Sequence, residues 1–160
     1  MERVALFPGS FDPFTRGHQA IVEQGLALFD RVVVAIGYNP SKRGLLDVES
    51  RKRLIEKVYQ NEPRVEVVTY TTLTGEEAQR VGAMALLRSV RNTQDFEFER
   101  TLAHANHHLY PELKSILVFV PAEVEHISSS LVRELHTFGR DTREFLPEGV
   151  ALEDYIRNDK

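Results

Sequence analysis

Residues 4–18 read VALFPGSFDPFTRGH and predict a buried strand, a glycine-containing loop and the start of a helix. Residues 4–7 are apolar without polar alternation, which is typical of a parallel strand covered on both faces. Pro8 and Gly9 are expected to end that strand. Gly9 and Gly17 permit close backbone approach. The helix that follows offers free N–H groups and the positive end of its dipole to an anion. This stretch therefore predicts a phosphate-binding loop at the end of a parallel strand.

The rest of the chain repeats this strand–helix alternation. Further apolar runs cover residues 31–36, 65–69, 83–87 and 115–120. Because parallel strands need crossover helices, the pattern predicts an α/β fold. We expect one Rossmann-like domain over residues 1–160, with a five-stranded parallel sheet and helices on both faces. Binding sites in such sheets form beyond the carboxyl ends of the strands.

Capping signals set the expected helix bounds. Asp47 is a candidate N-cap for a helix that runs to Val58. Thr74, with Glu77 three residues later, predicts a capping box. A long helix is expected over residues 93–109, and another from residues 128–130 to Gly139. A last helix is expected over residues 147–157, with proline in its first turn.

Composition excludes several classes of protein. The chain has 160 residues, a net charge of −4 and no cysteine, so it holds no disulfide, thiolate metal site or cysteine nucleophile. Duplex nucleic-acid binders carry a strongly basic face, so no nucleic acid partner is expected. No apolar run is long enough for a signal sequence or a membrane span. We therefore expect a cytoplasmic protein with no membrane partner.

The first loop offers a hydroxyl at Ser10 and an imidazole at His18. It matches neither the Walker pattern nor GxGxxG. A histidine at a helix start is more often a cap or a surface residue. Two glycines and a hydroxyl in the same loop shift the interpretation towards phosphate contact.

Cations follow two other strands. Lys42 follows the second strand and can reach a phosphate at the carboxyl edge of the sheet, or it can be a solvated surface lysine. Arg88 and Arg91 follow the fourth strand and can grip phosphate oxygens, or they can pair with Asp95, Glu97 or Glu99. Because His18, Lys42 and the two arginines follow three different strands, the sequence slightly favours the phosphate-binding interpretation.

The fifth strand leads to three serines, Ser128, Ser129 and Ser130. These are first of all N-cap candidates, although their hydroxyls and N–H groups also suit phosphates. His126 gives no clear signal. His104 and His108 share a helix face, but no third metal ligand is evident, so no metal site is expected. No Ser-His-Asp nucleophile set is evident either.

Taken together, these segments resemble the bacterial phosphopantetheine adenylyltransferases. GSFDPFTRGH is similar to that family's G-[ST]-F-D-P-x-T-x-G-H signature, and its T-x-G-H end also marks the wider HIGH-type nucleotidyltransferases. The resemblance extends over nearly the whole chain. The further matching segments are PSK (40–42), RSVR (88–91), DFEFE (95–99), LAHAN (102–106), PEL (111–113) and ISSS (127–130).

The resemblance implies an activity and a set of site residues. The activity is transfer of AMP from ATP to 4′-phosphopantetheine, with His18, Lys42 and Arg91 as catalytic residues. The implied ATP ligands are Ser10, Phe11, His18, Ser89, Val90, Arg91, Glu99, Val124, Glu125, His126, Ile127, Ser128, Ser129 and Ser130. The implied phosphopantetheine ligands are Ser10, Lys42, Thr74, Arg88, Leu102 and Asn106. It further implies Mg²⁺ as cofactor, a homohexamer and feedback by coenzyme A.

Four positions depart from the family pattern. Ser10 replaces the commoner Thr and keeps the hydroxyl, whereas Phe98 replaces a frequent Tyr and loses one. Ser89 stands where the family usually has Gly, which puts the local backbone geometry in question. Val124 stands where many members carry Trp, which affects how that loop covers a nucleotide.

The expected mechanism is direct in-line displacement, with charge supplied by His18, Lys42, Arg88, Arg91 and Mg²⁺. Three alternatives stay open. The first is a sister transferase that uses nicotinamide mononucleotide, or glycerol 3-phosphate with CTP. The second is a nucleotide-binding sensor without catalysis. The third is a structural assembly protein, for which no residue gives positive support.

Overall fold

Five parallel strands form one sheet in the order β3-β2-β1-β4-β5 in the computed structural model, which describes residues 1–157. The strands are β1 (Val4–Gly9), β2 (Arg31–Gly37), β3 (Val65–Tyr70), β4 (Ala85–Val90) and β5 (Lys114–Phe119). The predicted fold class is therefore confirmed.

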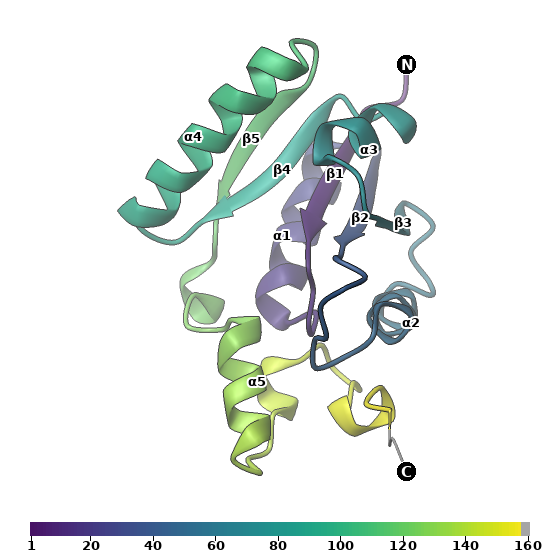
Figure 1. The fold of residues 1–160 in the computed structure, drawn as a ribbon, viewed down its shortest axis with the longest axis vertical. Coiled ribbons are helices and arrows are strands. Elements are labelled where there is room, and N and C mark those ends of the chain that lie inside the picture. The colour runs from purple at the N-terminus through teal and green to yellow at the C-terminus, as the bar shows by residue number, and fades with distance from the viewer. Residues whose placement is uncertain (158–160) are drawn as a thin grey trace.

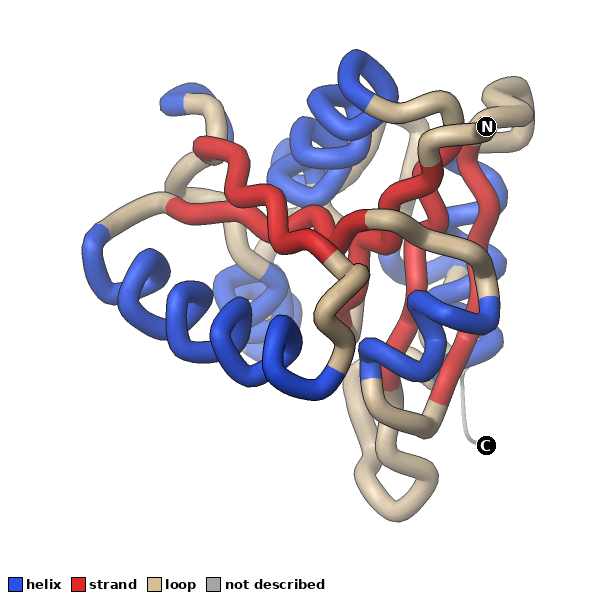
Figure 2. Tube along the Cα trace, turned by 90° about the horizontal axis from the view of Figure 1, so that it is seen from above, coloured by secondary structure: helices blue, strands red, loops and turns tan. Residues whose placement is uncertain are grey.

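Helices cover both faces of the sheet (Figure 2). They are α1 (Arg16–Leu28), α2 (Val48–Val58), α3 (Thr74–Arg80), α4 (Thr93–Leu109) and α5 (Ser129–Thr137), with short 3₁₀ turns η1 (Ala122–Val124), η2 (Arg143–Phe145) and η3 (Leu152–Asp154). In Figure 1, α4 runs beside β4 and β5, while α5 and the yellow C-terminal segment lie below the carboxyl end of β1.

Alternate side chains of each central strand enter different cores. In β2, Val32 and Val34 join the core formed with α1 and α2, whereas Val33 joins the core formed with α3. Val32, Val33 and Val34 are all fully buried. A sheet covered on both faces needs apolar residues at every position, which explains the continuous apolar runs in the sequence.

The strand order reverses direction between β1 and β4. The chain adds β2 and β3 on one side of β1 and then crosses to add β4 and β5 on the other. The loops after β1 and β4 consequently leave towards opposite faces, and a crevice forms at their carboxyl ends. This topology directs attention to the residues that follow Gly9 and to those around Val90.

β1 and β4 extend by two and three residues beyond their predicted ends, whereas β2 and β3 extend by one. β1 includes Pro8 and Gly9, which pair with β2, so the expectation that these residues end the strand is wrong. β4 covers residues 85–90 and not 83–87. Residues 88–90 remain paired with β5 although Arg88 and Ser89 are polar, and the Arg88 side chain is satisfied by the Pro8 carbonyl and Glu99.

The predicted capping box of α3 is wrong. The N-cap is Leu73, without a side-chain hydrogen bond, and Thr74 is already helical. The Thr74 hydroxyl instead forms a 2.9 Å hydrogen bond with the Tyr70 hydroxyl, and Glu77 pairs with Arg80. The predicted caps at Asp47 and Ser128 are confirmed.

The predicted C-terminal helix over residues 147–157 is also wrong. Only η3 (Leu152–Asp154) forms there. Gly149 has a φ of 80°, which a right-handed helix excludes, and it lies within the turn over residues 147–150 that is closed by the hydrogen bond from the Val150 N–H to the Pro147 carbonyl. Leu146 and Leu152 are nevertheless fully buried and close the core below α1 and α2.

No helix within residues 1–157 has the length and apolar character that a membrane crossing needs.

Close packing of α1 on the sheet depends on Gly25. A Cβ at this position would lie 2.7 Å from Leu87 Cδ2 and 3.0 Å from Val32 Cγ2, both within the core. Gly25→Ala is therefore expected to lower the free energy of unfolding by about 1–3 kcal/mol, because the helix must shift outwards. Urea denaturation followed by circular dichroism measures the change. Ala27→Ser, at an exposed position of the same helix, is the control, and equal stability of the two variants would contradict the packing argument.

Candidate active site

Three adjoining cavities lie at the carboxyl end of β1 and between α4 and the sheet. The first, of about 400 Å³, is here called the His18 cavity and is lined by Ser10, Thr15, Gly17, His18, Ile21, Ser89, Arg91, Asp95, Phe98, Glu99, Val120, Ile127, Ser128, Ser129, Ser130 and Arg133. The second, of about 240 Å³, is the Asn106 cavity and is lined by Pro8, Leu73, Thr74, Gly75, Leu86, Arg88, Glu99, Leu102, Ala103, Asn106, Leu109, Tyr110 and Ser115.

The third cavity joins the other two. This junction cavity, of about 310 Å³, is lined by Phe7, Pro8, Gly9, Ser10, Phe11, His18, Arg88, Ser89 and Glu99. It shares Ser10, His18, Ser89 and Glu99 with the His18 cavity, and Pro8, Arg88 and Glu99 with the Asn106 cavity. Two ligands bound in the outer cavities would therefore meet beside Ser10 and His18.

His18 is held by the start of α1. Thr15 is the N-cap, and its N–H donates to His18 Nδ1 over 3.0 Å. Because Nδ1 accepts this hydrogen bond, the neutral ring carries its proton on Nε2. The capping and phosphate-contact interpretations of His18 therefore use different nitrogens and are compatible.

The imidazole of His18 is uncharged at neutral pH. Burial, and to a lesser extent the positive charge of Arg91, lowers its pKa from the usual 6.5 to about 4. The rings of Phe11 and Phe14 lie 5.0 Å and 5.4 Å from the imidazole centre and supply much of the apolar surrounding. The expectation that His18 contributes positive charge is thus wrong. It offers a neutral N–H donor.

The two arginines around β4 line different cavities. Arg88 forms two hydrogen bonds to Glu99, of 2.9 Å and 2.8 Å, and lines the Asn106 and junction cavities. Arg91 lines the His18 cavity, with its Nε 3.6 Å from Asp95 Oδ2. Both arginines therefore form the ion pairs that the sequence allowed, and both also line cavities. They do not converge on one cavity in this structure.

The three serines at α5 have separate partners. Ser128 Oγ accepts from the Leu131 N–H, as an N-cap does. Ser129 Oγ donates to the Pro13 carbonyl over 2.8 Å, and Ser130 Oγ accepts from Arg133. All three serines line the His18 cavity. The helix start is thereby fixed to the first loop.

Several predicted ligands lie away from the His18 cavity. Val90 and Val124 are buried, and Phe11 lies under Gly9, where it lines only the junction cavity. Glu125 contributes a carbonyl that accepts from Arg91, while the exposed His126 packs edge-on against Phe145.

Lys42 lies in a separate cavity of about 800 Å³, here called the Lys42 cavity. Its lining includes Ser10, which also lines the His18 and junction cavities. The other predicted phosphopantetheine ligands, Thr74, Arg88, Leu102 and Asn106, all line the Asn106 cavity. The structure thus brings these four together and leaves Lys42 on the other side of Ser10.

Sequence reasoning missed two arginines. Arg133 lines both the His18 and the Lys42 cavity and donates to the Asp12 carbonyl over 2.8 Å. Its position one helical turn after Ser129 was the available signal. Arg51 is buried beside Asp12 and donates to the Ser10 carbonyl over 3.2 Å. Nothing in the periodicity of α2 distinguishes it from its neighbours.

The donor set suits Mg²⁺ bound to a nucleotide. Within residues 1–157, no three His, Asp or Glu side chains gather as a metal site, and His104 and His108 are both exposed. Mg²⁺ commonly takes one or two carboxylates together with substrate phosphates and water. Asp95 and Ser10 are oxygen donors at the His18 cavity. The residues therefore fit a Mg²⁺ whose main ligands are phosphates.

Comparison with known proteins identifies the family. The chain matches the cytidylyltransferase-like family model over residues 6–135. It is 49% identical to a phosphopantetheine adenylyltransferase of Porphyromonas gingivalis over 152 residues, which cover 95% of this chain and 99% of that protein. It is 40% identical to a phosphopantetheine adenylyltransferase of Bacteroides thetaiotaomicron over 150 residues, 94% of this chain and 99% of that one.

The chain belongs to the phosphopantetheine adenylyltransferase family. The resemblance seen in the sequence motifs is confirmed, and so is the prediction of a nucleotidyltransferase.

Solved structures of other adenylyltransferases have the same fold as this phosphopantetheine adenylyltransferase family member. A bifunctional NMN adenylyltransferase/ADP ribose pyrophosphatase of Francisella tularensis superposes with a TM-score of 0.70 at 16% identity, over 94% of this chain and 46% of that one. A putative nicotinate-nucleotide adenylyltransferase of Vibrio parahaemolyticus gives a TM-score of 0.65 at 19% identity, over 91% and 94%. At these identities the similarity concerns the fold alone.

The lowered pKa of His18 makes folding depend on pH. An unfolded histidine takes up its proton near pH 6.5, whereas His18 in the folded protein takes it up only near pH 4. The unfolded state therefore binds more protons between these values, and stability falls as the pH drops from 6.5 towards 4. Between pH 7 and 4.5, the wild type is expected to lose about 1–3 kcal/mol more stability than His18→Gln.

Urea denaturation at both pH values measures this difference. His107→Gln, at an exposed position of α4, is the control and should follow the wild type. Parallel losses in the wild type and His18→Gln would mean that burial does not suppress protonation of His18.

Proposed function

We propose that this chain transfers AMP from ATP to 4′-phosphopantetheine, which yields dephospho-coenzyme A and pyrophosphate. The observation that carries the proposal is the junction cavity. It connects a polar cavity at the starts of α1 and α5 to a second cavity with apolar walls, and Ser10 and His18 line the connection. A reaction between two separately bound substrates needs such an arrangement.

The His18 cavity suits a nucleotide. The starts of α1 and α5 both face it and offer N–H groups and hydroxyls to phosphates. Arg91 supplies a positive charge, and Phe98, Val120 and Ile127 supply apolar surface for a base. We assign ATP to this cavity, with Ser10, His18, Ser89, Arg91 and Ser128 to Ser130 as its ligands.

The Asn106 cavity suits the pantetheine arm. This arm is a narrow chain with two amides, so it needs apolar walls with a few hydrogen-bonding groups. Leu73, Leu102 and Leu109 supply the walls, while Thr74 and Asn106 supply polar contacts. Arg88 stands at the opening to the junction cavity, where the phosphate at the end of the arm would lie. We assign Lys42 to the same phosphate, from the opposite side of Ser10.

The proposed reaction is a direct in-line displacement. A phosphate oxygen of phosphopantetheine attacks the α-phosphorus of ATP, the bond from this phosphorus to the bridging oxygen of the β-phosphate breaks, and pyrophosphate leaves with that electron pair. A phosphate monoester is largely ionised at pH 7, since its second pKa is about 6, so no general base is required. Catalysis then depends on alignment and on charge stabilisation.

His18 and Arg91 have different tasks in this mechanism. The neutral His18 donates a hydrogen bond from Nε2 to a non-bridging oxygen of the α-phosphate. Arg91 balances the negative charge of the transferred group. When bound, Mg²⁺ neutralises charge on the phosphates, with Ser10 and Asp95 as the protein oxygens that would hold it directly or through water.

The assembly and regulation are likewise proposals. α4 exposes Phe96 and β5 exposes Phe119, so apolar surface outside the substrate cavities is available for contacts between copies in a homohexamer. Coenzyme A carries the pantetheine arm, so it would compete for the Asn106 cavity and provide feedback. We propose one nucleotidyltransferase domain over residues 1–160, located in the cytoplasm, without a nucleic acid or membrane partner.

The substrate pair is tested by pyrophosphate release. Purified protein with ATP, Mg²⁺ and 4′-phosphopantetheine is expected to release pyrophosphate and form dephospho-coenzyme A. Parallel reactions contain nicotinamide mononucleotide with ATP, and glycerol 3-phosphate with CTP. Release only with nicotinamide mononucleotide and ATP, or only with glycerol 3-phosphate and CTP, would assign the chain to that sister activity. No release by folded protein that binds ATP would support the nucleotide-binding sensor.

The role of His18 is tested by His18→Ala. Loss of one preorganised hydrogen-bond donor commonly lowers kcat by about 10²–10³. We expect a decrease of this size, with ATP affinity changed far less, as measured by steady-state kinetics and calorimetric titration. His107→Ala serves as the matched histidine control. A turnover close to that of the wild type would sink the assigned role.

A further inference from the structure

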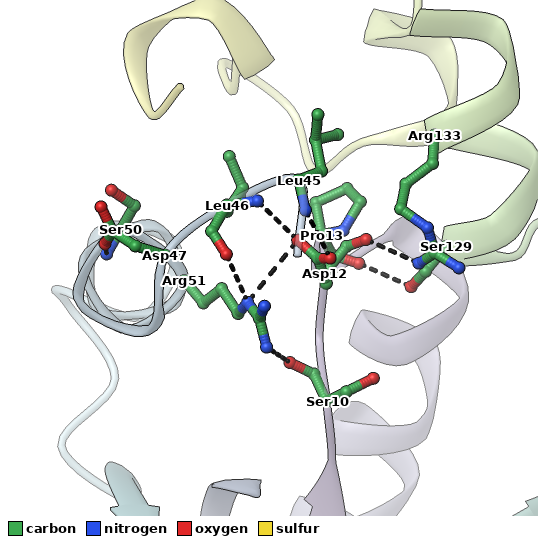
Figure 3. A network of polar contacts seen from close by, with 10 residues as sticks. All are labelled: Ser10, Asp12, Pro13, Leu45, Leu46, Asp47, Ser50, Arg51, Ser129 and Arg133. Carbon is green, nitrogen blue, oxygen red and sulfur yellow. Dashed lines mark hydrogen bonds and ion pairs between the residues drawn. The ribbon is translucent and has the colours of Figure 1, made fainter. Parts of the chain in front are cut away.

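Arg51 is buried between two loops that carry proposed phosphate ligands. It lies on α2 with 8% of its surface exposed. Its Nε donates to the Leu46 carbonyl over 2.9 Å, and its Nη1 donates to the Ser10 carbonyl over 3.2 Å. One planar guanidinium thus contacts the loop after β1 and the loop after β2 (Figure 3).

Asp12 completes this connection. Its Oδ2 accepts from the Leu45 N–H over 2.8 Å, and its Oδ1 accepts from the Leu46 N–H over 2.7 Å. Arg51 Nε lies 3.5 Å from the same Oδ1. The carboxylate therefore fixes the end of the loop that carries Lys42 to the loop that carries Ser10.

The chain passes so close to this pair that a side chain would not fit. A Cβ on Gly44 would overlap Arg51 Nη2 and Asp12 Oδ2. Burying two charges costs desolvation free energy, and well-packed apolar residues often serve stability as well or better. What the ion pair supplies, and apolar residues do not, is a set of directed hydrogen bonds to the Ser10, Leu45 and Leu46 backbone.

The groups held in this way face the cavities. Ser10 lines the His18, junction and Lys42 cavities, and Lys42 lines the last of these. A shift of Ser10 relative to the Lys42 loop would therefore alter how an acceptor phosphate approaches the nucleotide. Misplacement by about 1 Å can cost about 10²-fold in rate even when the altered residue does not touch the reacting atoms.

We propose that Arg51 is a positioning residue for adenylyl transfer. Arg51 also lines the Lys42 cavity. Its proposed role is to set the spacing between Ser10 and the Lys42 loop, through Asp12 and the Ser10 carbonyl, and not to act on the reacting atoms. This inference rests on the proposed function, because it takes Ser10 and Lys42 as ligands of the reacting phosphates.

Arg51→Lys tests the proposal while it keeps the positive charge. A lysine has one nitrogen and cannot replace the planar fork that reaches Ser10, Leu46 and Asp12 together. The expected result is a fall in kcat of about 10–100-fold, together with a several-fold rise in KM for phosphopantetheine. A purely structural role would lower the amount of active enzyme, so kcat would fall while both KM values stay unchanged.

Arg53→Lys is the matched control. Arg53 lies on the same helix, is exposed and stacks over the ring of Tyr155 at 5.2 Å. Its kinetics are expected to match those of the wild type. Wild-type kinetics in folded Arg51→Lys, or a fall in kcat without any change in KM, would overturn the proposal.

Gly44→Ala gives an independent test if Arg51→Lys does not fold. It displaces the contact between Arg51 and Asp12 without changing a charge, so the same rise in KM is expected. Normal kinetics of folded Gly44→Ala would overturn the proposal.

All variants are measured with the acceptor that the wild type uses. If that acceptor is not phosphopantetheine, the proposed function fails while the role of Arg51 is still decided by the comparison with the wild type.

Discussion

The site depends on one buried carboxylate, that of Asp12. Removing a carboxylate from water is costly unless its oxygens accept hydrogen bonds. Here the Leu45 and Leu46 N–H groups and Arg51 offset that cost. The backbone around Asp12 also contacts α5, because Arg133 donates a hydrogen bond to the Asp12 carbonyl and Ser129 donates one to the Pro13 carbonyl. Figure 3 shows how loops after two strands and the start of α5 meet at this residue.

Burial also determines what His18 can contribute. The same phenylalanines that fill the base of the first loop surround the imidazole and keep it uncharged. A charged imidazole would compete with Arg91 for the space where negative charge develops and would be repelled by it. A neutral ring, oriented by the Thr15 N–H, combines a fixed hydrogen-bond donor with an adjacent permanent cation. The proposed division of tasks between His18 and Arg91 follows from this geometry.

Local patterns predicted the sheet, the five helices α1 to α5 and the segments that form the site. Apolar runs such as that of β2 report burial on both faces, and caps such as Asp47 act within one turn of chain. Failures occurred where a particular contact or a single glycine overrides the local pattern. The Thr74 hydroxyl is taken by Tyr70, polar residues at the end of β4 stay paired with β5, and Gly149 interrupts the last helix. Arg51 was missed because its partners are 5 to 41 residues away in sequence.

Glu99 weakens the positive charge that Arg88 presents to a ligand. It is buried, and it takes both of its hydrogen bonds from Arg88, which lies between the Asn106 and junction cavities. This pairing orients the Arg88 guanidinium but cancels much of its charge. Arg91 is more exposed and holds Asp95 at a longer distance, so more of its charge remains available at the His18 cavity. In the proposed arrangement an acceptor phosphate would therefore gain less attraction from Arg88 than the nucleotide phosphates gain from Arg91, and Lys42 would supply further charge to the acceptor. The pairing with Glu99 thus suits Arg88 to orienting the attacking phosphate, while Arg91 suits the stabilisation of charge on the nucleotide.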